Sequence, residues 1–287
     1  MIYNALANDL RLTADVVHHY ISSNLGLAGI QIESFIESSI DYKPTFVVNT
    51  RDHHILCVDV SENIYNPTRW HFISECEKKC IPVKLYVALP SISYGGFAQD
   101  IKEAKTSSVG ILDVDTNHRS CQELNAPLSL SLTGLRNFDK TTFPKKHREL
   151  IYQAENLFKG GDPNKACSNI YDEIERVTRS IAVKSYRAGK WKVTLSDPTI
   201  LENRLAWAKV VLHLRDDLIR NRTSRYHVLS ETLISRIHGI TSHRNDSGHK
   251  PRNKKELIKR DSQLRTRMES AVDLLQELTN AVKSLKV

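Results

Sequence analysis

Two short apolar runs, Thr45-Phe-Val-Val-Asn49 and Ile55-Leu-Cys-Val-Asp-Val60, are separated by a polar turn that begins Thr50-Arg-Asp-His53. Runs of β-branched and aliphatic residues bounded by polar turns predict β-strands, and two such runs joined closely predict a hairpin. The second run is almost continuously apolar, as expected for a buried strand. We therefore expect this hairpin to begin a β-sheet.

Strand and helix signals alternate after the hairpin. Asn66-Pro67 begins a predicted helix that reaches about Lys79, and Val83–Leu89 follows as a strand. Gly96–Lys105 is then expected as a helix and Val109–Val114 as another strand. This alternation predicts an α/β sheet whose later strands are parallel.

The regions on either side of this alternation have weaker signals. Residues 1–40 contain apolar residues at helical spacing before and after a break at Gly26–Gly29, so we expect two helices there, the second over Ile30–Ile40. Residues 116–143 are expected to be an irregular connection, with a short edge strand as an option at Leu128-Ser-Leu-Ser-Leu-Thr133.

The chain after Pro144 is expected to be entirely helical. An apolar residue recurs every three or four positions through most of it, which predicts an antiparallel helical bundle. The expected helices are 145–158, 163–186, 199–220, 228–247 and 254–285. We therefore predict two domains, an α/β domain at 1–143 and an all-α domain at 144–287.

Charge divides the chain at the same place. Residues 145–287 contain 29 Lys/Arg and 17 Asp/Glu, whereas residues 1–144 contain 12 and 16. The basic half is the candidate for binding a polyanion.

Five cysteines without framework spacing indicate reduced thiols and a cytoplasmic location. No apolar run is long enough for a membrane span, so no membrane partner is expected.

The order hairpin, helix, strand, helix, strand resembles the restriction-endonuclease-like fold, also called PD-(D/E)xK, over roughly residues 30–116. That resemblance implies two carboxylates that hold a divalent metal and a lysine that orients water. The equivalent triplet here is Asp59-Val60-Ser61, with serine where the lysine belongs. Asp52 is the candidate hairpin acid and Glu62 a third carboxylate, with Lys78 or Lys79 as substitute lysines. We expect a catalytically incomplete domain with a nucleic-acid or protein ligand.

Cys76 and Cys80 stand four positions apart on the predicted helix, near His71. No second pair of ligands accompanies them, so buried packing is the better interpretation than zinc. We expect no metal and no cofactor.

The stretch Ile237-His-Gly-Ile-Thr-Ser-His-Arg244-Asn245-Asp-Ser-Gly-His249-Lys-Pro251 holds the second set of candidates. On one continuous helix Arg244 and His249 would point about 140° apart, so they converge only if the helix ends between them. Ser247-Gly248 predicts such an end, and Pro251 prevents a restart.

This motif, at the end of the penultimate helix of a basic bundle, resembles the R-x(4–6)-H signature of the HEPN family. The resemblance covers about residues 145–287 and implies a metal-independent endoribonuclease. His249 would transfer protons, Arg244 would stabilise the phosphate, and Asn245 would orient either group. Expected products are a 2′,3′-cyclic phosphate and a 5′-hydroxyl.

The resemblance also implies a homodimer through the bundle, with RNA as the partner, because one histidine does not easily serve as both base and acid. Glu173 and Glu175 are candidate supporting carboxylates, although surface positions are the simpler expectation. A microbial defence or toxin system would suit this pairing of domains. Two alternatives stay open: a non-catalytic HEPN-like dimerisation or nucleic-acid-binding regulator, and a metal-dependent DNA nuclease that uses Asp52, Asp59 and Glu62.

Overall fold

The computed structural model describes residues 3–4, 6–91, 108–187, 205–220, 229–242 and 250–284. The chain forms two compact units. The sheet unit comprises Met1–Leu135, Lys159–Gly161 and Lys250–Gln263, and the helical unit comprises Arg136–Phe158, Asp162–His249 and Leu264–Val287. Residues 136–143, which we assigned to the first domain, therefore lie with the helices, and two later stretches lie with the sheet.

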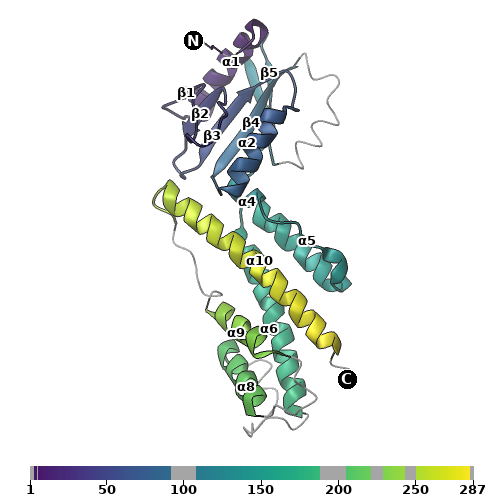
Figure 1. Cartoon of the computed structure of the whole chain (residues 1–287). Coiled ribbons are helices and arrows are strands. Elements are labelled where there is room, and N and C mark those ends of the chain that lie inside the picture. The colour runs from purple at the N-terminus through teal and green to yellow at the C-terminus, as the bar shows by residue number, and fades with distance from the viewer. Residues whose placement is uncertain are drawn as a thin grey trace. The chain divides into compact units, whose positions relative to one another are not determined.

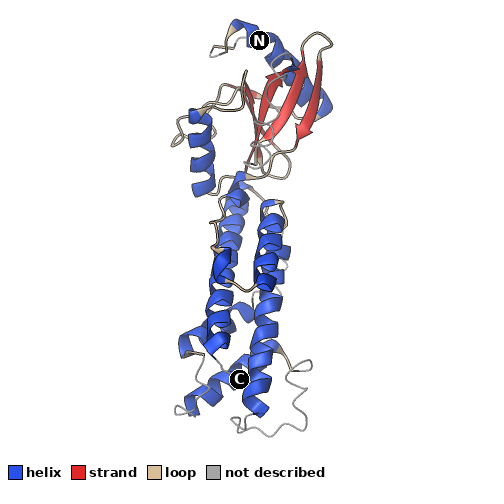
Figure 2. Ribbon diagram, turned by 90° about the vertical axis from the view of Figure 1, so that its right-hand side faces the viewer, coloured by secondary structure: helices blue, strands red, loops and turns tan. Residues whose placement is uncertain are grey.

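The sheet unit contains a six-stranded mixed sheet in the order β1-β2-β3-β4-β5-β6, drawn in red in Figure 2. Its strands are β1 (Gln31–Ile32), β2 (Phe46–Asn49), β3 (Ile55–Val60), β4 (Val83–Pro90), β5 (Gly110–Asp115) and β6 (Ser120–Asn125). The predicted hairpin is confirmed, since β2 and β3 pair antiparallel. The predicted parallel strands are also confirmed, because β3, β4 and β5 pair in parallel.

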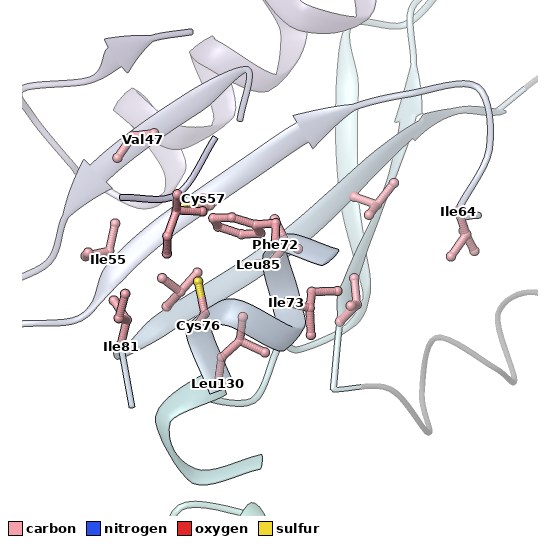
Figure 3. Close-up of a cluster of buried hydrophobic side chains, with 14 of the residues drawn as sticks. Val47, Ile55, Cys57, Ile64, Phe72, Ile73, Cys76, Ile81, Leu85 and Leu130 are labelled. Atoms are coloured by element: carbon pink, nitrogen blue, oxygen red, sulfur yellow. The ribbon is translucent and has the colours of Figure 1, made fainter. Parts of the chain in front are cut away.

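Helices cover both faces of this sheet (Figure 1). One face packs against α1 (Arg11–His19), which follows the 3-10 turn η1 (Asn8–Leu10) and continues into the π-helical turn η2 (Tyr20–Asn24). The other packs against α2 (Pro67–Lys78), through Phe72, Ile73 and Cys76 (Figure 3). The two apolar faces of the central strands explain their continuous hydrophobic runs.

Helix α2 begins where the sequence predicted it. The Asn66 side chain accepts hydrogen bonds from the backbone N–H groups of Thr68 and Arg69, at 2.9 and 3.2 Å. Pro67, which lacks an N–H, occupies the first helical position. The Arg69 side chain is thereby placed in the first turn of α2, beside the end of β3.

Two sequence predictions for the sheet unit are wrong. Residues 30–40 form the short strand β1 and turns rather than a helix, with Glu33 at a φ of 47°. The alternating stretch at 128–133 contains the short helix α4 (Leu130–Thr133), with Leu130 and Leu132 both buried. The edge strand is instead β6, which pairs antiparallel with β5. The helix expected at 96–105 lies outside the described residues.

The helical unit contains the turn η4 (Lys140–Thr142) and the described helices α5 (Lys145–Lys159), α6 (Pro163–Arg187), α8 (Trp207–Arg220) and α9 (Glu231–Thr241). The helix α10 (Lys254–Ser284) begins in the sheet unit and continues in the helical unit. Gly161, at a φ of 98°, separates α5 from α6, and Asp162 accepts from the Lys165 N–H at 3.1 Å. The predicted apolar faces of α6 and α10 are buried, except for half-buried Val282.

Candidate functional site

The predicted catalytic residues Arg244, Asn245 and His249 lie outside the described residues, so their geometry is not described. The described chain resumes at Lys250 and enters α10 at Lys254. What the structure describes is the pair of helices that flank this motif along the chain.

Helix α9 ends at Thr241, whereas the sequence predicted that this helix would continue to Ser247. The Thr241 hydroxyl donates to the His238 carbonyl at 2.8 Å, and the Ser242 hydroxyl donates to the Gly239 carbonyl at 3.0 Å. These hydroxyls satisfy carbonyl oxygens in the last turn, which is how polar side chains compete with helix propagation. The α9 helix therefore stops before the motif.

Helix α9 is held within the helical unit by an N-terminal cap, a buried apolar face and an ion pair. The Ser230 side chain accepts from the Leu233 N–H at 3.1 Å and caps the helix N-terminus. Leu233, Ile234 and Ile237 form its buried face. Arg236 Nη1 lies 2.5 Å from Glu277 Oε1 of α10, so α9 and α10 are joined by an ion pair.

Asp59, the first acid of the nuclease-like set, is held by two side chains. Tyr42 donates its hydroxyl to Asp59 Oδ2 at 2.5 Å, and Arg69 Nε donates to the same oxygen at 2.7 Å. Burial and the Asp59 charge raise the pKa of Tyr42, so the phenol stays protonated and remains a donor. The carboxylate is thus engaged by protein groups.

Arg69 is itself buried, with only 1% of its surface exposed. Its Nη1 donates to the Ile64 carbonyl at 2.6 Å and to the Asn63 carbonyl at 3.4 Å. A buried arginine needs such acceptors together with an anion, because its charge is costly to remove from water. Asp59 is that anion, so its charge balances a core guanidinium.

Asp52 occupies the turn between β2 and β3, beyond the Asn49–Ile55 pair that closes the hairpin. His54 Nδ1 and Lys84 Nζ lie 2.9 and 3.6 Å from its Oδ2. Burial alone would raise the pKa of Asp52, but the Thr50 hydroxyl, His54 and Lys84 lower it to about 2. Asp59 lies four residues further along β3 than Ile55, so roughly 13 Å of strand separates Asp59 from the end of the hairpin that holds Asp52.

Glu62 follows β3 and is fully exposed to solvent. A hydrogen bond with the Asp9 side chain and the charge of that carboxylate raise the pKa of Glu62. The structure therefore gives Asp52, Asp59 and Glu62 three separate sets of partners. In the part of the chain that is described, no three His, Cys, Asp or Glu side chains gather closely enough to hold a metal ion.

The sequence did not predict a buried polar network in the helical unit. His147 Nε2 lies 2.8 Å from Glu173 Oε1, and His147 Nδ1 lies 3.1 Å from the Thr279 hydroxyl. Arg176 donates to both oxygens of Glu173, at 2.6 and 2.8 Å, and Lys146 Nζ approaches to 3.5 Å. This network joins α5, α6 and α10.

Glu173 is therefore a buried structural acid, which corrects the expectation of a surface position. Burial would raise the pKa of Glu173, but its bonds to Arg176 and His147 lower it to about 2. Glu175 accepts from Arg179 Nε at 2.7 Å, one helical turn away.

All five cysteines are free thiols, and Cys76 and Cys80 are both buried. Burial raises the pKa of Cys76 to about 12, which keeps it a protonated apolar side chain.

Over the described helices, none combines the length and the apolar character that crossing a bilayer requires. Comparison of the chain with protein-family models, curated proteins and solved structures gives no match.

Proposed function

We propose that this protein is a metal-independent endoribonuclease of the HEPN type, with its reaction centre at Arg244, Asn245 and His249. The observation that carries the proposal is the sequence Arg244-x4-His249 between α9 and α10. Two described features support it. Helix α9 ends just before the motif, and the Arg236–Glu277 ion pair joins α9 to α10.

The chemistry suits these residue types. A base removes the proton of the ribose 2′-hydroxyl, whose oxygen then attacks the adjacent phosphorus. The bond from phosphorus to the 5′-oxygen breaks, and an acid protonates that leaving oxygen. His249 supplies or accepts one of these protons, and Arg244 stabilises the charge on the non-bridging phosphate oxygens. The products are a 2′,3′-cyclic phosphate and a 5′-hydroxyl, and no metal is needed.

A second motif would supply the other proton-transfer group, so we propose a homodimer through the helical unit.

For the sheet unit we propose a restriction-endonuclease-like ancestry, supported by the β2–β3 hairpin and the parallel strands that follow. Its Asp59 is neutralised by Arg69, and serine replaces the expected lysine at residue 61. We therefore propose that this unit binds a ligand or regulates the ribonuclease. Free thiols at all five cysteines agree with the proposed cytoplasmic location.

The test is cleavage of labelled single-stranded RNA and of DNA of the same sequence, each with EDTA or with magnesium. Wild-type protein should cleave RNA in EDTA and leave DNA intact. His249→Ala and Arg244→Ala should each lose about 10²-fold or more in rate. His238→Ala is the matched control, since His238 is an exposed histidine of α9, and it should keep full activity.

The product ends give a second readout. The 3′ fragments should accept phosphate from polynucleotide kinase directly, because they carry 5′-hydroxyl groups. Magnesium-dependent DNA cleavage that is lost in Glu62→Gln would contradict the proposal and favour the metal-dependent alternative. RNA binding without cleavage under any condition would favour a non-catalytic regulator.

A further inference from the structure

The start of α10 carries a dense group of positive charges. Five cationic side chains fall between residues 250 and 259, and we call them the basic strip: Lys250, Arg252, Lys254, Lys255 and Lys259. Lys254 is half-buried, and the other four are exposed. None of the five forms a salt bridge with another described residue.

These charges oppose the dipole of their own helix. The N-terminal end of a helix carries partial positive charge, so acidic residues stabilise it and basic residues destabilise it. Lys254 and Lys255 occupy the first turn of a helix 31 residues long, and Glu256 is the acidic residue in that turn. An arrangement that lowers helix stability is explained if an anion binds there.

Two lysines of the strip, Lys255 and Lys259, lie on the side of α10 opposite its buried residues. Leu257 and Asp261 are each 1% exposed, and Ser131 donates to Asp261 at 2.6 Å. Two residues along a helix correspond to a rotation of about 200°, so Lys255 and Lys259 lie opposite Leu257 and Asp261. The buried pair fixes the helix, and the exposed lysines lie about 6 Å apart along its axis.

The sheet unit carries a further exposed cation directly after α2. Lys79, at the C-terminal end of α2, is exposed, and its Nζ donates to the Ser39 hydroxyl at 2.8 Å. Burial raises the pKa of Cys76, and the nearby charges of Lys254 and Lys79 both act against this rise. Lys79 and Lys254 both belong to the sheet unit.

We propose that the basic strip, which directly follows residues 244–249 in the sequence, binds the phosphate backbone of single-stranded RNA. A row of exposed cations suits a linear chain of phosphates, since each neutralised phosphate releases counterions. This inference rests on the proposed ribonuclease function, because that function makes RNA the polyanion that must reach the motif.

The experiment measures RNA binding by fluorescence anisotropy over a range of salt concentrations. Full-length protein carries His249→Ala throughout, so that RNA stays intact. Adding Lys255→Glu and Lys259→Glu should weaken binding about 10-fold to 100-fold. The slope of log affinity against log salt concentration should become shallower by roughly 1.4, because each of the two lost phosphate contacts contributes about 0.7.

The matched control is Lys145→Glu, which reverses an exposed cation in the first turn of α5. It should leave affinity within about twofold of the parent. Lys254→Glu with Lys255→Glu gives a separate readout of the dipole argument. It should raise the melting temperature by about 1–4 °C while weakening RNA binding.

Unchanged affinity and salt slope in Lys255→Glu/Lys259→Glu would overturn the inference, as would an equal loss in Lys145→Glu. Strip-dependent binding to phosphatidylserine vesicles, with no binding to RNA, would also overturn it. Strip-dependent RNA binding without cleavage by wild type would uphold the inference while the proposed function fails. Cleavage that depends on His249 but is unchanged by the strip substitutions would uphold the proposed function and overturn the inference.

Discussion

Arg69 and Asp59 form an ion pair in which Nε and Nη2 of the arginine both lie 2.7 Å from Oδ2 of the aspartate. The arginine side chain is only 2% exposed and the aspartate 14%. The pair joins the first turn of α2 to the end of β3, where the sequence placed a metal-binding acid. Its geometry makes Asp59 part of the core that holds the helix on the sheet.

Removing the arginine should leave the aspartate charge without its cation. We predict that Arg69→Leu lowers the free energy of unfolding of the sheet unit by about 3–5 kcal/mol, measured by urea denaturation. Arg51→Leu, an exposed arginine of the neighbouring turn, should change it by less than about 0.5 kcal/mol. The double variant Asp59→Leu/Arg69→Leu should recover part of the loss. An Arg69→Leu protein as stable as wild type would show that the pair is dispensable.

The Glu173 network should make the helical unit sensitive to acid. Neighbouring groups lower the pKa of Glu173 from 4.5 to about 2, so the folded state favours its ionised form. The resulting stability is complete above the unfolded pKa and is lost as the pH falls toward 2. Between pH 6 and pH 2.5 the free energy of unfolding of wild type should fall by about 1–2 kcal/mol more than that of Glu173→Gln. The difference is limited to this size because solvent screens the ion pair with the exposed Arg176.

The measurement is urea denaturation followed by circular dichroism at a series of pH values. Glu149→Gln removes an exposed carboxylate from α5 and should leave the wild-type pH dependence intact. Parallel curves for wild type and Glu173→Gln would argue against the network as the source of the acid sensitivity.

Two glycines should respond to alanine in opposite directions. A Cβ at Gly110 of β5 would lie 2.5 Å from the Tyr86 ring and 2.7 Å from Pro127, whereas at Gly239 of α9 it would meet nothing within 4 Å. Gly110→Ala should therefore destabilise the protein by about 1–3 kcal/mol through overpacking. Gly239→Ala should stabilise it by roughly 0.5–1 kcal/mol through helix propensity. Thermal unfolding measures both, and equal effects would contradict the packing argument.

The proposed homodimer can be tested on two exposed tyrosines. Tyr152 of α5 is 59% exposed in the helical unit, and Tyr65 is 70% exposed in the sheet unit. Exposed aromatic residues are frequent interface anchors. We predict that wild type sediments as a dimer at micromolar concentration and that Tyr152→Glu raises the dissociation constant about tenfold or more. Tyr65→Glu should leave it unchanged. A strictly monomeric wild type would contradict a two-motif cleft.

The central strands and long helices could be predicted because their apolar residues recur with a clear period. The strand β6, Ser-Cys-Gln-Glu-Leu-Asn, has no such pattern. It forms because it pairs with β5 at the sheet edge, with Ser120 opposite Asp115, and edge strands need little apolar character. The region 30–40 misled the prediction because its isoleucines contact the sheet from a strand and turns.

The buried polar contacts were missed although the sequence carries a signal for them. Arg69 stands on the same helical stripe as Phe72, Ile73 and Cys76, all of which are buried. His147 likewise precedes Ile151 and Ala154 on the buried face of α5. A charged or polar residue on an apolar stripe must bury its group with a partner. The partners themselves, Asp59 and Glu173, come from other elements, so spacing along the chain does not identify them.

The sheet unit is built from chain segments that lie far apart in the sequence, and this affects how it folds during synthesis. The Ser131 hydroxyl donates to Asp261, which is 130 positions further along the chain, and Leu257 is buried in the same segment. When all six strands have left the ribosome, neither Leu257 nor Asp261 has been synthesised. Co-translational folding can therefore assemble the sheet early but cannot add the start of α10 to the sheet unit. The segment from Arg244 to His249 is always translated before this unit is complete.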